Sequence, residues 1–136
     1  MKRSAKAVWK GTVKDGSGIL TTQSTTLNNT QYSFKSRFED GVGTNPEELL
    51  AAAHAGCFTM KTSALLSEAG YNPETLETDC KISMEEGEIT LSELTLTAKI
   101  PGISEDDFQK IAQDAKENCP VSQAFSFEKT LTATLA

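Results

Sequence analysis

The residues best suited to chemistry in this chain are two of its three cysteines. Cys57 lies in an alanine-rich, strongly helical stretch, and Cys119 stands directly before Pro120 at the end of a second helical stretch. Cys80 lies between them in a segment with a strand pattern. Two thiols on separate helices can meet only through the fold, and a thiol pair that meets is suited to redox chemistry. One thiolate can attack a peroxide, and the other can resolve the sulfenic acid that results.

A reactive cysteine needs nearby positive charge, because the thiolate is the nucleophile. Arg37 is the candidate, since it lies on the polar face of an otherwise apolar segment over residues 31–38. Glu47 or Glu48, across a short glycine-rich loop, could hold its guanidinium in a bidentate pair. Glu47 and Cys57 are ten residues apart, a spacing that places them on different sides of a straight helix. Glu47 could therefore approach the thiol through Arg37 or through a loose first turn.

Each of these residues also has a structural interpretation. Free cysteines are among the most buried residues, and core packing is the favoured interpretation of Cys80. Arg37 could be an ordinary solvated residue, and the two glutamates could simply favour the positive end of a helix dipole. Between the glutamates, we expect Glu47 to pair with Arg37 and keep Glu48 as the alternative.

The single histidine, His54, precedes Cys57 by one helical turn. A thiolate–imidazolium pair is conceivable there, but we favour a packed, hydrogen-bonded histidine. A zinc site made of His54, Cys57 and Cys119 would lack a fourth ligand and the usual close spacing of cysteines. A hydrolase based on Cys57 and His54 would lack a residue that orients the imidazole. We therefore expect no metal and no bound cofactor.

Composition limits the possible partners and compartments. The chain has 136 residues and a formal net charge of −6, so we expect one domain that does not bind nucleic acid or an anionic membrane surface. We find no 18-residue segment apolar enough to span a membrane. The positive N-terminus has no apolar region of a secretory signal behind it. These observations favour a cytoplasmic protein, in which thiols stay reduced.

The chain first predicts three strands and a helix. Strands are expected at residues 5–13, 18–26 and 31–38, with a turn signal between the first two. A helix should start near Pro46, after a cap at Thr44 or Asn45, and run to about Ala69, where Gly70 stops it. We expect this helix to be central and buried, with one apolar stripe that consists of Leu50, Ala53, Cys57, Met60 and Ala64.

The second half predicts two more strands, a helix and a last strand, at residues 75–85, 88–100, 105–118 and 125–135. The alternation of the second of these strands slips near Ser92, which indicates a bulge. Ser104 is placed to cap the helix. The order βββαββαβ favours an α+β fold with antiparallel sheets.

Two motifs resemble the OsmC/Ohr superfamily, whose members are osmotically inducible or organic-hydroperoxide-resistance proteins. The first motif runs from Arg37 through residues 43–49 (GTNPEEL) to residues 52–58 (AAHAGCF), and the second is residues 118–122 (NCPVS). Residues 9–11 (WKG) and the closing strand match as well, so the resemblance covers nearly the full length. The position of the arginine, just before the glycine-rich loop, resembles the OsmC branch. In the Ohr branch the functional arginine lies nearer the N-terminus.

The resemblance implies a thiol peroxidase that acts on organic hydroperoxides and less efficiently on hydrogen peroxide. Cys57 would be the peroxidatic thiolate and Cys119 the resolving thiol, joined in a disulfide after oxidation. Arg37 would lower the pKa of Cys57, and Glu47 would hold Arg37. The family fold is an intertwined homodimer in which sheets wrap around paired central helices, with active sites at the interface. The usual reductant is a dithiol such as a lipoylated protein.

Two questions stay open at this point. Phe58 is a candidate for the apolar wall that a bulky alkyl peroxide needs, although the sequence does not select among the aromatic residues. A non-catalytic domain of the same fold, used for redox sensing or for binding an apolar ligand, is the main alternative to a peroxidase. The two functions differ in turnover, because a sensor oxidises once whereas a peroxidase is recycled by a dithiol.

Overall fold

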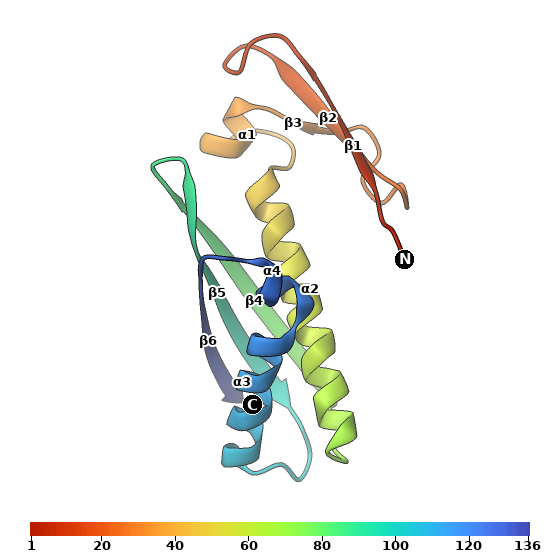
Figure 1. Ribbon diagram of the computed structural model, residues 1–136, viewed down its shortest axis with the longest axis vertical. Helices are drawn as coiled ribbons and strands as arrows, with labels where there is room; N and C mark the ends of the chain where they lie inside the picture. The colour runs from red at the N-terminus through yellow and green to blue at the C-terminus, as the bar shows by residue number, and fades with distance from the viewer. The chain divides into compact units, whose positions relative to one another are not determined.

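The computed structural model describes residues 1–136 (Figure 1). The chain forms two compact units, Met1–Leu49 and Leu50–Ala136. The elements of both units are mixed α and β, as the sequence predicts.

The first unit contains a three-stranded antiparallel sheet in the order β1-β2-β3. Its strands are β1 (Ala5–Lys10), β2 (Ser17–Thr22) and β3 (Thr30–Tyr32), which confirms the predicted meander with shorter strands. Gly18 of β2 pairs with Trp9 on one side and with Tyr32 on the other. A Cβ at this position would lie 2.5 Å from the Tyr32 ring and 2.6 Å from the Trp9 ring. Glycine therefore allows the two aromatic rings to approach to 5.3 Å between centroids.

The strand predicted over residues 31–38 is wrong beyond Tyr32, because the helix α1 (Phe34–Phe38) follows. Ser33 caps this helix: its hydroxyl accepts from the Ser36 N–H at 3.2 Å, and the Ser36 hydroxyl accepts from the Ser33 N–H at 2.8 Å. This reciprocal capping box provides acceptors for the backbone N–H groups of Ser33 and Ser36, which in a strand would need acceptors on a neighbouring strand. The rings of Phe34 and Phe38 then pack one helical turn apart, with centroids at 5.0 Å. Arg37 thus lies on a helix, not on a strand.

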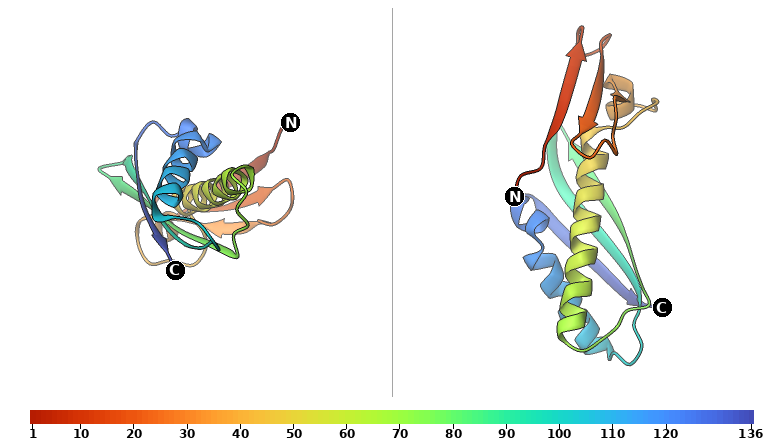
Figure 2. Two further views of the ribbon diagram at one scale, coloured as in Figure 1. Left: turned by 90° about the horizontal axis from the view of Figure 1, so that it is seen from below. Right: turned by 90° about the vertical axis from the view of Figure 1, so that its right-hand side faces the viewer.

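The second unit consists of a sheet covered on one face by helices (Figure 2). Its sheet has the order β4-β5-β6, with β4 (Thr75–Glu85), β5 (Glu88–Lys99) and β6 (Glu128–Leu135). The helices are α3 (Glu105–Asn118), α4 (Pro120–Ala124) and most of α2 (Pro46–Glu68), which begins at the end of the first unit. The predicted bounds of α3, β4 and β5 are confirmed within a residue, whereas the short α4 was not predicted.

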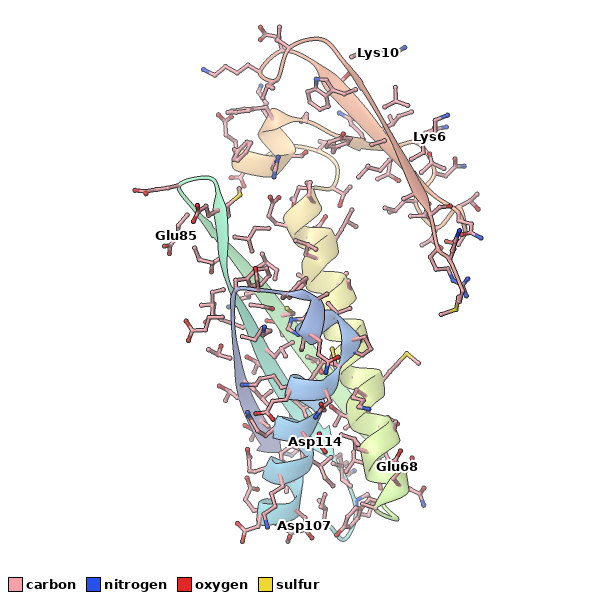
Figure 3. All side chains as sticks on the ribbon, viewed as in Figure 1. Lys6, Lys10, Glu68, Glu85, Asp107 and Asp114 are labelled. Carbon is pink, nitrogen blue, oxygen red and sulfur yellow. The ribbon has the colours of Figure 1, made fainter.

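The core of this unit lies between the sheet and the helices. Buried apolar residues come from α2, β5 and α3, and they include Phe58, Leu66, Leu94, Leu96, Phe108 and Ala112. Charged residues of α3 such as Asp107 and Asp114 lie on its exposed face (Figure 3). The serine cap of α3 is confirmed, because the Ser104 hydroxyl accepts from the Asp107 N–H at 3.2 Å.

A bulge in the sheet decides which residues of β5 face the core. The pairs Ser83–Leu91 and Met84–Ile89 leave Thr90 without a partner, which is a bulge close to the predicted slip. Beyond the bulge, every second residue from Ser92 to Ala98 is buried.

The expected antiparallel arrangement is wrong for the last strand, because β6 pairs with β5 in parallel. The long connection through α3 and α4 makes this possible, since parallel neighbours need a crossover of a dozen or more residues.

The buried face of α2 differs from the predicted stripe. Its buried residues are His54, Phe58, Thr62 and Leu66. Ala53, Met60 and Ala64, which we expected to be buried, are exposed, with Met60 at 77% exposure. The helix is alanine-rich and apolar on more than one side, so its sequence alone does not select the face that packs. A second apolar face remains uncovered in the single chain.

The expectation that no segment could span a membrane is also corrected at α2. By length and composition, Pro46–Glu68 is apolar enough to cross one, with a mean hydropathy of 1.2. Core helices pass the same test, and His54, Phe58 and Leu66 of α2 pack into the core of the second unit. Only 22% of the most apolar 18-residue stretch of α2 is buried, so the helix has a large uncovered apolar surface.

Candidate functional site

The fold brings two cysteines together in the second unit. Cys57 lies on α2, and Cys119 is both the C-cap of α3 and the N-cap of α4. Both are free thiols, and they lie close enough for each side chain to affect the pKa of the other. Cys119 is fully buried, whereas Cys57 is partly exposed. An exposed thiol next to a buried one is an arrangement in which one sulfur can meet an external reagent and the other can react with its product.

The surroundings of the two thiols differ in their effect on acidity. Burial raises the pKa of Cys57, and its hydrogen bond with Cys119 raises this pKa further, against smaller opposing effects of the Val121 backbone and Lys61. Burial also raises the pKa of Cys119, but hydrogen bonds from Ser122 and Cys57 outweigh it, so the pKa is lowered overall. Hydrogen bonding thus opposes the cost of burial at Cys119, whereas burial dominates at Cys57, where a nearby cation would favour the thiolate.

Ser122 is the main partner of the Cys119 sulfur. The Ser122 backbone N–H donates to Sγ of Cys119 at 3.3 Å, and the Ser122 side chain helps to lower the pKa of this cysteine. Pro120 at the first position of α4 turns the chain back, so that residue 122 returns to the cysteine that caps the helix. The hydrogen bond from Ser122 follows directly from this capping turn.

In the first unit, Arg37 of α1 and Glu47 of α2 form an ion pair. Nη2 of Arg37 lies 2.8 Å from Oε1 of Glu47, and Nε lies 3.0 Å from the same oxygen and 3.3 Å from Oε2. The Arg37 side chain is 40% exposed, while that of Glu47 is 12% exposed. The contact fixes the plane and direction of the guanidinium, because two of its three nitrogens bind one carboxylate.

Local contacts of the helix N-terminus position this ion pair. Asn45 caps α2, because its Oδ1 accepts from the Glu48 N–H at 2.8 Å. The Asn45 amide nitrogen also donates to the Ser36 carbonyl at 2.9 Å, which joins the start of α2 to α1. Glu48, the alternative partner for the arginine, instead accepts from the Thr44 hydroxyl at 2.6 Å.

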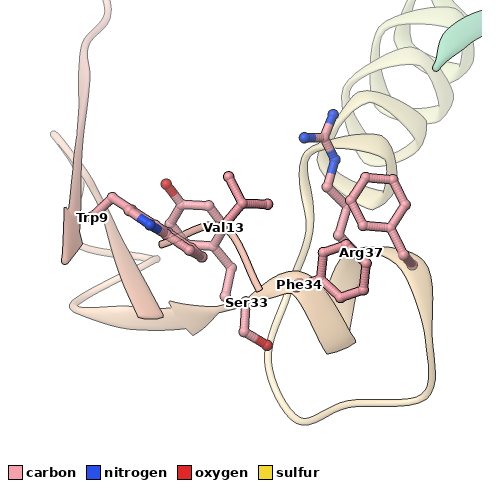
Figure 4. A pocket seen from close by; sticks show the side chains of 7 residues that line it. Trp9, Val13, Ser33, Phe34 and Arg37 are labelled. Carbon is pink, nitrogen blue, oxygen red and sulfur yellow. The ribbon is translucent and has the colours of Figure 1, made fainter. Parts of the chain in front are cut away.

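An aromatic pocket of about 210 Å³ lies beside Arg37 in the first unit (Figure 4). Its walls include Trp9, Tyr32, Phe34 and Phe38. The Arg37 guanidinium carbon lies 5.2 Å from the centre of the Phe38 ring. Phe58, which the sequence made a candidate for such a wall, has no exposed surface and belongs to the core of the second unit. The pocket combines apolar rings with one cation, which suits a ligand that has an apolar body and a polar end.

His54 is completely buried, and both its ring nitrogens are hydrogen bonded. Nδ1 lies 2.6 Å from the Ser92 hydroxyl, and Nε2 lies 2.6 Å from the Ser122 hydroxyl. Burial lowers the pKa of His54, and the charge of Lys129 lowers it further, so the neutral imidazole is favoured. Since serines occupy both nitrogens, the histidine is not available as an imidazolium partner for Cys57.

Sequence reasoning missed the two serines that hold His54. Ser122 belongs to the second motif, but its motif position gave no indication of a partner. Ser92 is a polar residue at an inward position of β5, next to the bulge, and it is fully buried. A polar residue on the buried face of a strand needs a hydrogen-bond partner, and that signal could have marked Ser92.

The structure thus brings the expected residues together in two pairs, one in each unit. Cys57 meets Cys119 in the second unit, and Arg37 meets Glu47 in the first. Cys80 lies on β4, partly buried, with its Sγ 3.3 Å from the Ser92 hydroxyl. No group of three or more histidine, cysteine, aspartate or glutamate side chains is arranged to hold a metal ion.

The fold and the facing thiols define an α+β dithiol protein, and comparison with known proteins identifies its family. A family model described as OsmC-like protein matches residues 38–134. The chain is 42% identical to peroxiredoxin OsmC of Escherichia coli (strain K12) over 133 residues, which are 95% of this chain and 93% of that protein. The chain belongs to the OsmC family.

Solved structures with low sequence identity share the fold. An OsmC-like protein from Mycoplasma pneumoniae matches with a TM-score of 0.76 at 14% identity, over 100% of this chain and 98% of that one. The organic hydroperoxide resistance protein OhrB of Bacillus subtilis matches with a TM-score of 0.64 at 23% identity, over 98% of both chains.

Proposed function

We propose that this protein is a cysteine-based peroxidase that reduces organic hydroperoxides and, less efficiently, hydrogen peroxide. The observation that carries the proposal is the contact between a partly exposed Cys57 and a buried Cys119. Membership of the OsmC family supports it, because the relative with 42% identity is called a peroxiredoxin. The reaction needs no metal and no bound cofactor.

In the first step, the Cys57 thiolate attacks the distal oxygen of the hydroperoxide. A sulfur–oxygen bond forms and the oxygen–oxygen bond breaks, so Cys57 is oxidised and the peroxide is reduced. The departing alkoxide takes a proton and leaves as the alcohol. Cys57 remains as the sulfenic acid.

In the second step, the Cys119 thiolate attacks the sulfur of the Cys57 sulfenic acid. The disulfide bond forms, the sulfur–oxygen bond breaks, and hydroxide leaves and becomes water with the proton that Cys119 gave up. An external dithiol, such as a lipoylated protein, then reduces the disulfide by exchange. Both thiols return, and the dithiol leaves as its own disulfide.

Cys57 needs more positive charge than Lys61 supplies, because burial outweighs the effect of Lys61 on its pKa. We infer that residues 1–136 act as one peroxidase domain, in which Arg37 lowers the pKa of Cys57 and Glu47 holds Arg37. Arg37 then stabilises both the thiolate and the charge that develops on the peroxide oxygens. The aromatic pocket beside Arg37 supports an organic substrate, because it offers apolar walls to an alkyl group.

The active protein is a homodimer in this proposal. The uncovered face of α2 supports it, since Met60 is 77% exposed on a helix whose most apolar part is only 22% buried. Large exposed apolar surfaces of this kind mark interaction sites, and a second copy of the same helix is a matching partner. We further propose that the protein works in the cytoplasm, where dithiol reductants are available.

Intact mass under denaturing, non-reducing conditions tests the proposal. After one equivalent of tert-butyl hydroperoxide, the wild-type mass should fall by about two units as the disulfide forms. Cys57→Ser should show no change, and Cys119→Ser should gain about 16 units as a sulfenic acid, or about 32 or 48 units as its further oxides. An unchanged wild-type mass would reject the peroxidase in favour of an apolar-ligand-binding domain. Oxidation without repeated turnover in excess lipoamide dithiol would favour a sensor.

A further inference from the structure

Ser122 makes hydrogen bonds at two of its atoms, and the two bonds lead to different elements. Its backbone N–H donates to Sγ of Cys119 at 3.3 Å, across the capping turn from Cys119 to Ser122. Its hydroxyl lies 2.6 Å from Nε2 of His54, a residue of α2. The serine and the histidine are both buried, with 1% and 0% of their surface exposed. One buried serine therefore connects the turn that carries Cys119 with the helix that carries Cys57.

These residues form two pairs with the same spacing. Cys57 follows His54 by three residues on α2, and Ser122 follows Cys119 by three residues into α4. Residues three apart on a helix are neighbours on its surface. Cys57 packs against the core cluster to which Cys119 belongs, and His54 is bonded to Ser122. The contact between the histidine and the serine thus lies beside the two thiols.

The position of α4 depends on His54. The helix has only five residues, and a helix of this length is not stable by itself in water. Besides Ser122, its C-cap Phe125 also contacts the histidine, with the two rings edge-on and 5.1 Å between their centroids. The histidine is itself fixed, because its Nδ1 lies 2.6 Å from the buried hydroxyl of Ser92 on β5. His54 therefore joins the capping turn to both α2 and the sheet.

We propose that His54 is a positioning residue that holds the capping turn against α2, where the Cys119 sulfur stays within reach of Cys57. The inference rests on the proposed function, because the step that it serves is closure of the disulfide. A thiol that is already held beside its partner loses little further freedom when the bond forms. The contact with His54 therefore favours the disulfide over the open dithiol.

The equilibrium between the dithiol and the disulfide tests this without any peroxide. Oxidised dithiothreitol accepts two electrons and two protons from the pair and leaves as its dithiol, while the bond between Cys57 and Cys119 forms. Buffers of oxidised and reduced dithiothreitol at neutral pH set the potential. Peptide mass spectrometry after acid quenching then gives the oxidised fraction of this pair.

Ser122→Ala removes the hydroxyl that binds His54 and keeps the backbone N–H that binds Cys119. We expect its equilibrium constant for disulfide formation to fall roughly fivefold, the contribution of one hydrogen bond between neutral groups, which is about 20 mV. No fall would overturn the inference. A rise would overturn it as well, because the contact would then hold the two thiols apart.

Ser92→Ala is the matched control. It removes an equally buried hydroxyl at the same 2.6 Å from His54, but from β5, which carries neither Cys57 nor Cys119. It should destabilise the fold to urea about as much as Ser122→Ala and change the equilibrium constant less than about twofold. Equal falls in the two serine variants would overturn the inference, because the loss would then follow from a general weakening of the core.

Two histidine variants separate the histidine from a direct effect of Ser122 on the sulfur. A glutamine amide reaches about as far as Nε2, so His54→Gln keeps the contact with Ser122, whereas the shorter His54→Asn keeps only the contact with Ser92. We expect His54→Asn to lower the equilibrium constant as Ser122→Ala does, and His54→Gln to lower it less. Combining His54→Asn with Ser122→Ala should cause no further fall, because both remove the same contact. Additive falls would overturn the role of His54 and leave Ser122 acting alone.

These results are distinguishable from a failure of the proposed function. A wild-type protein that forms the disulfide in dithiothreitol buffers but not with tert-butyl hydroperoxide would reject the peroxidase and leave the role of His54 standing. A wild-type protein that reacts with the peroxide, together with unchanged equilibria in Ser122→Ala and His54→Asn, would reject the role of His54 alone.

Discussion

The guanidinium of Arg37 and the carboxylate of Glu47 meet through nitrogen–oxygen contacts of 2.8 and 3.0 Å, although they lie on different helices. Because two nitrogens bind one carboxylate, the arginine is oriented and not merely attracted. Its orientation depends in turn on Asn45, which caps α2 and also binds the Ser36 carbonyl of α1 at 2.9 Å. The first unit is therefore built to present one fixed cation beside an aromatic pocket.

Glu47→Gln should reduce the rate of tert-butyl hydroperoxide reduction by about tenfold, because the amide cannot hold the guanidinium in a charged bidentate pair. The rate is measured with lipoamide dithiol as reductant. Glu74→Gln makes the same chemical change in an exposed ion pair with Lys99 and should leave the rate unchanged. Equal rates in the two variants would contradict the proposed role of Glu47.

Arg37→Met should move the pH dependence of Cys57 oxidation to higher pH. Burial already raises the pKa of Cys57, so the oxidation rate should rise with pH as the thiol ionises. Removal of the cation disfavours the thiolate further. The rate of sulfenic acid formation in a Cys119→Ser background measures this, with the exposed Arg3→Met as the matched control. An unchanged pH profile in Arg37→Met would show that Arg37 does not lower the pKa of Cys57.

The free energy of unfolding should fall as the pH drops below about 6.5, the ordinary pKa of histidine. Burial lowers the pKa of His54 in the folded state, so the unfolded chain binds the proton more readily. The stabilisation is complete above the unfolded pKa and is lost as the pH falls toward the lower folded value. His54 is the single histidine, so urea unfolding between pH 7.5 and 5.5 assigns the effect. His54→Gln should flatten this dependence, and a slope equal to that of the wild type would assign it elsewhere.

Met60→Lys should turn the proposed dimer into a monomer. The methionine is 77% exposed on the uncovered face of α2, where a charge would have to be buried against the second copy. Sedimentation velocity gives the mass of the particle in solution. Val42→Lys changes an equally exposed apolar residue, at 81% exposure, on a loop and should leave the mass unaltered. A wild-type protein that sediments as a monomer would contradict the proposed dimer.

Local sequence patterns determined most of the elements. The helix over residues 105–118 follows from a serine cap and a periodic apolar face, and β4 and β5 follow from alternation. The strand predicted over residues 31–38 was wrong beyond Tyr32 because the same apolar pattern also fits a helix, where Phe34 and Phe38 are one turn apart. The capping box between Ser33 and Ser36 favours the helix. Short elements of this kind depend on a few hydrogen bonds that hydrophobic patterns do not report.

The sequence by itself also singled out the two cysteines, the arginine and the glutamate as candidates, because they stand in two motifs that resemble those of the OsmC/Ohr superfamily. Only the tertiary structure decided the face on which α2 packs, the parallel direction of β6, and the serines that hold His54. Those serines lie 38 and 68 residues from the histidine along the chain. Contacts over such separations depend on how the sheet and helices pack, and no local periodicity contains that information.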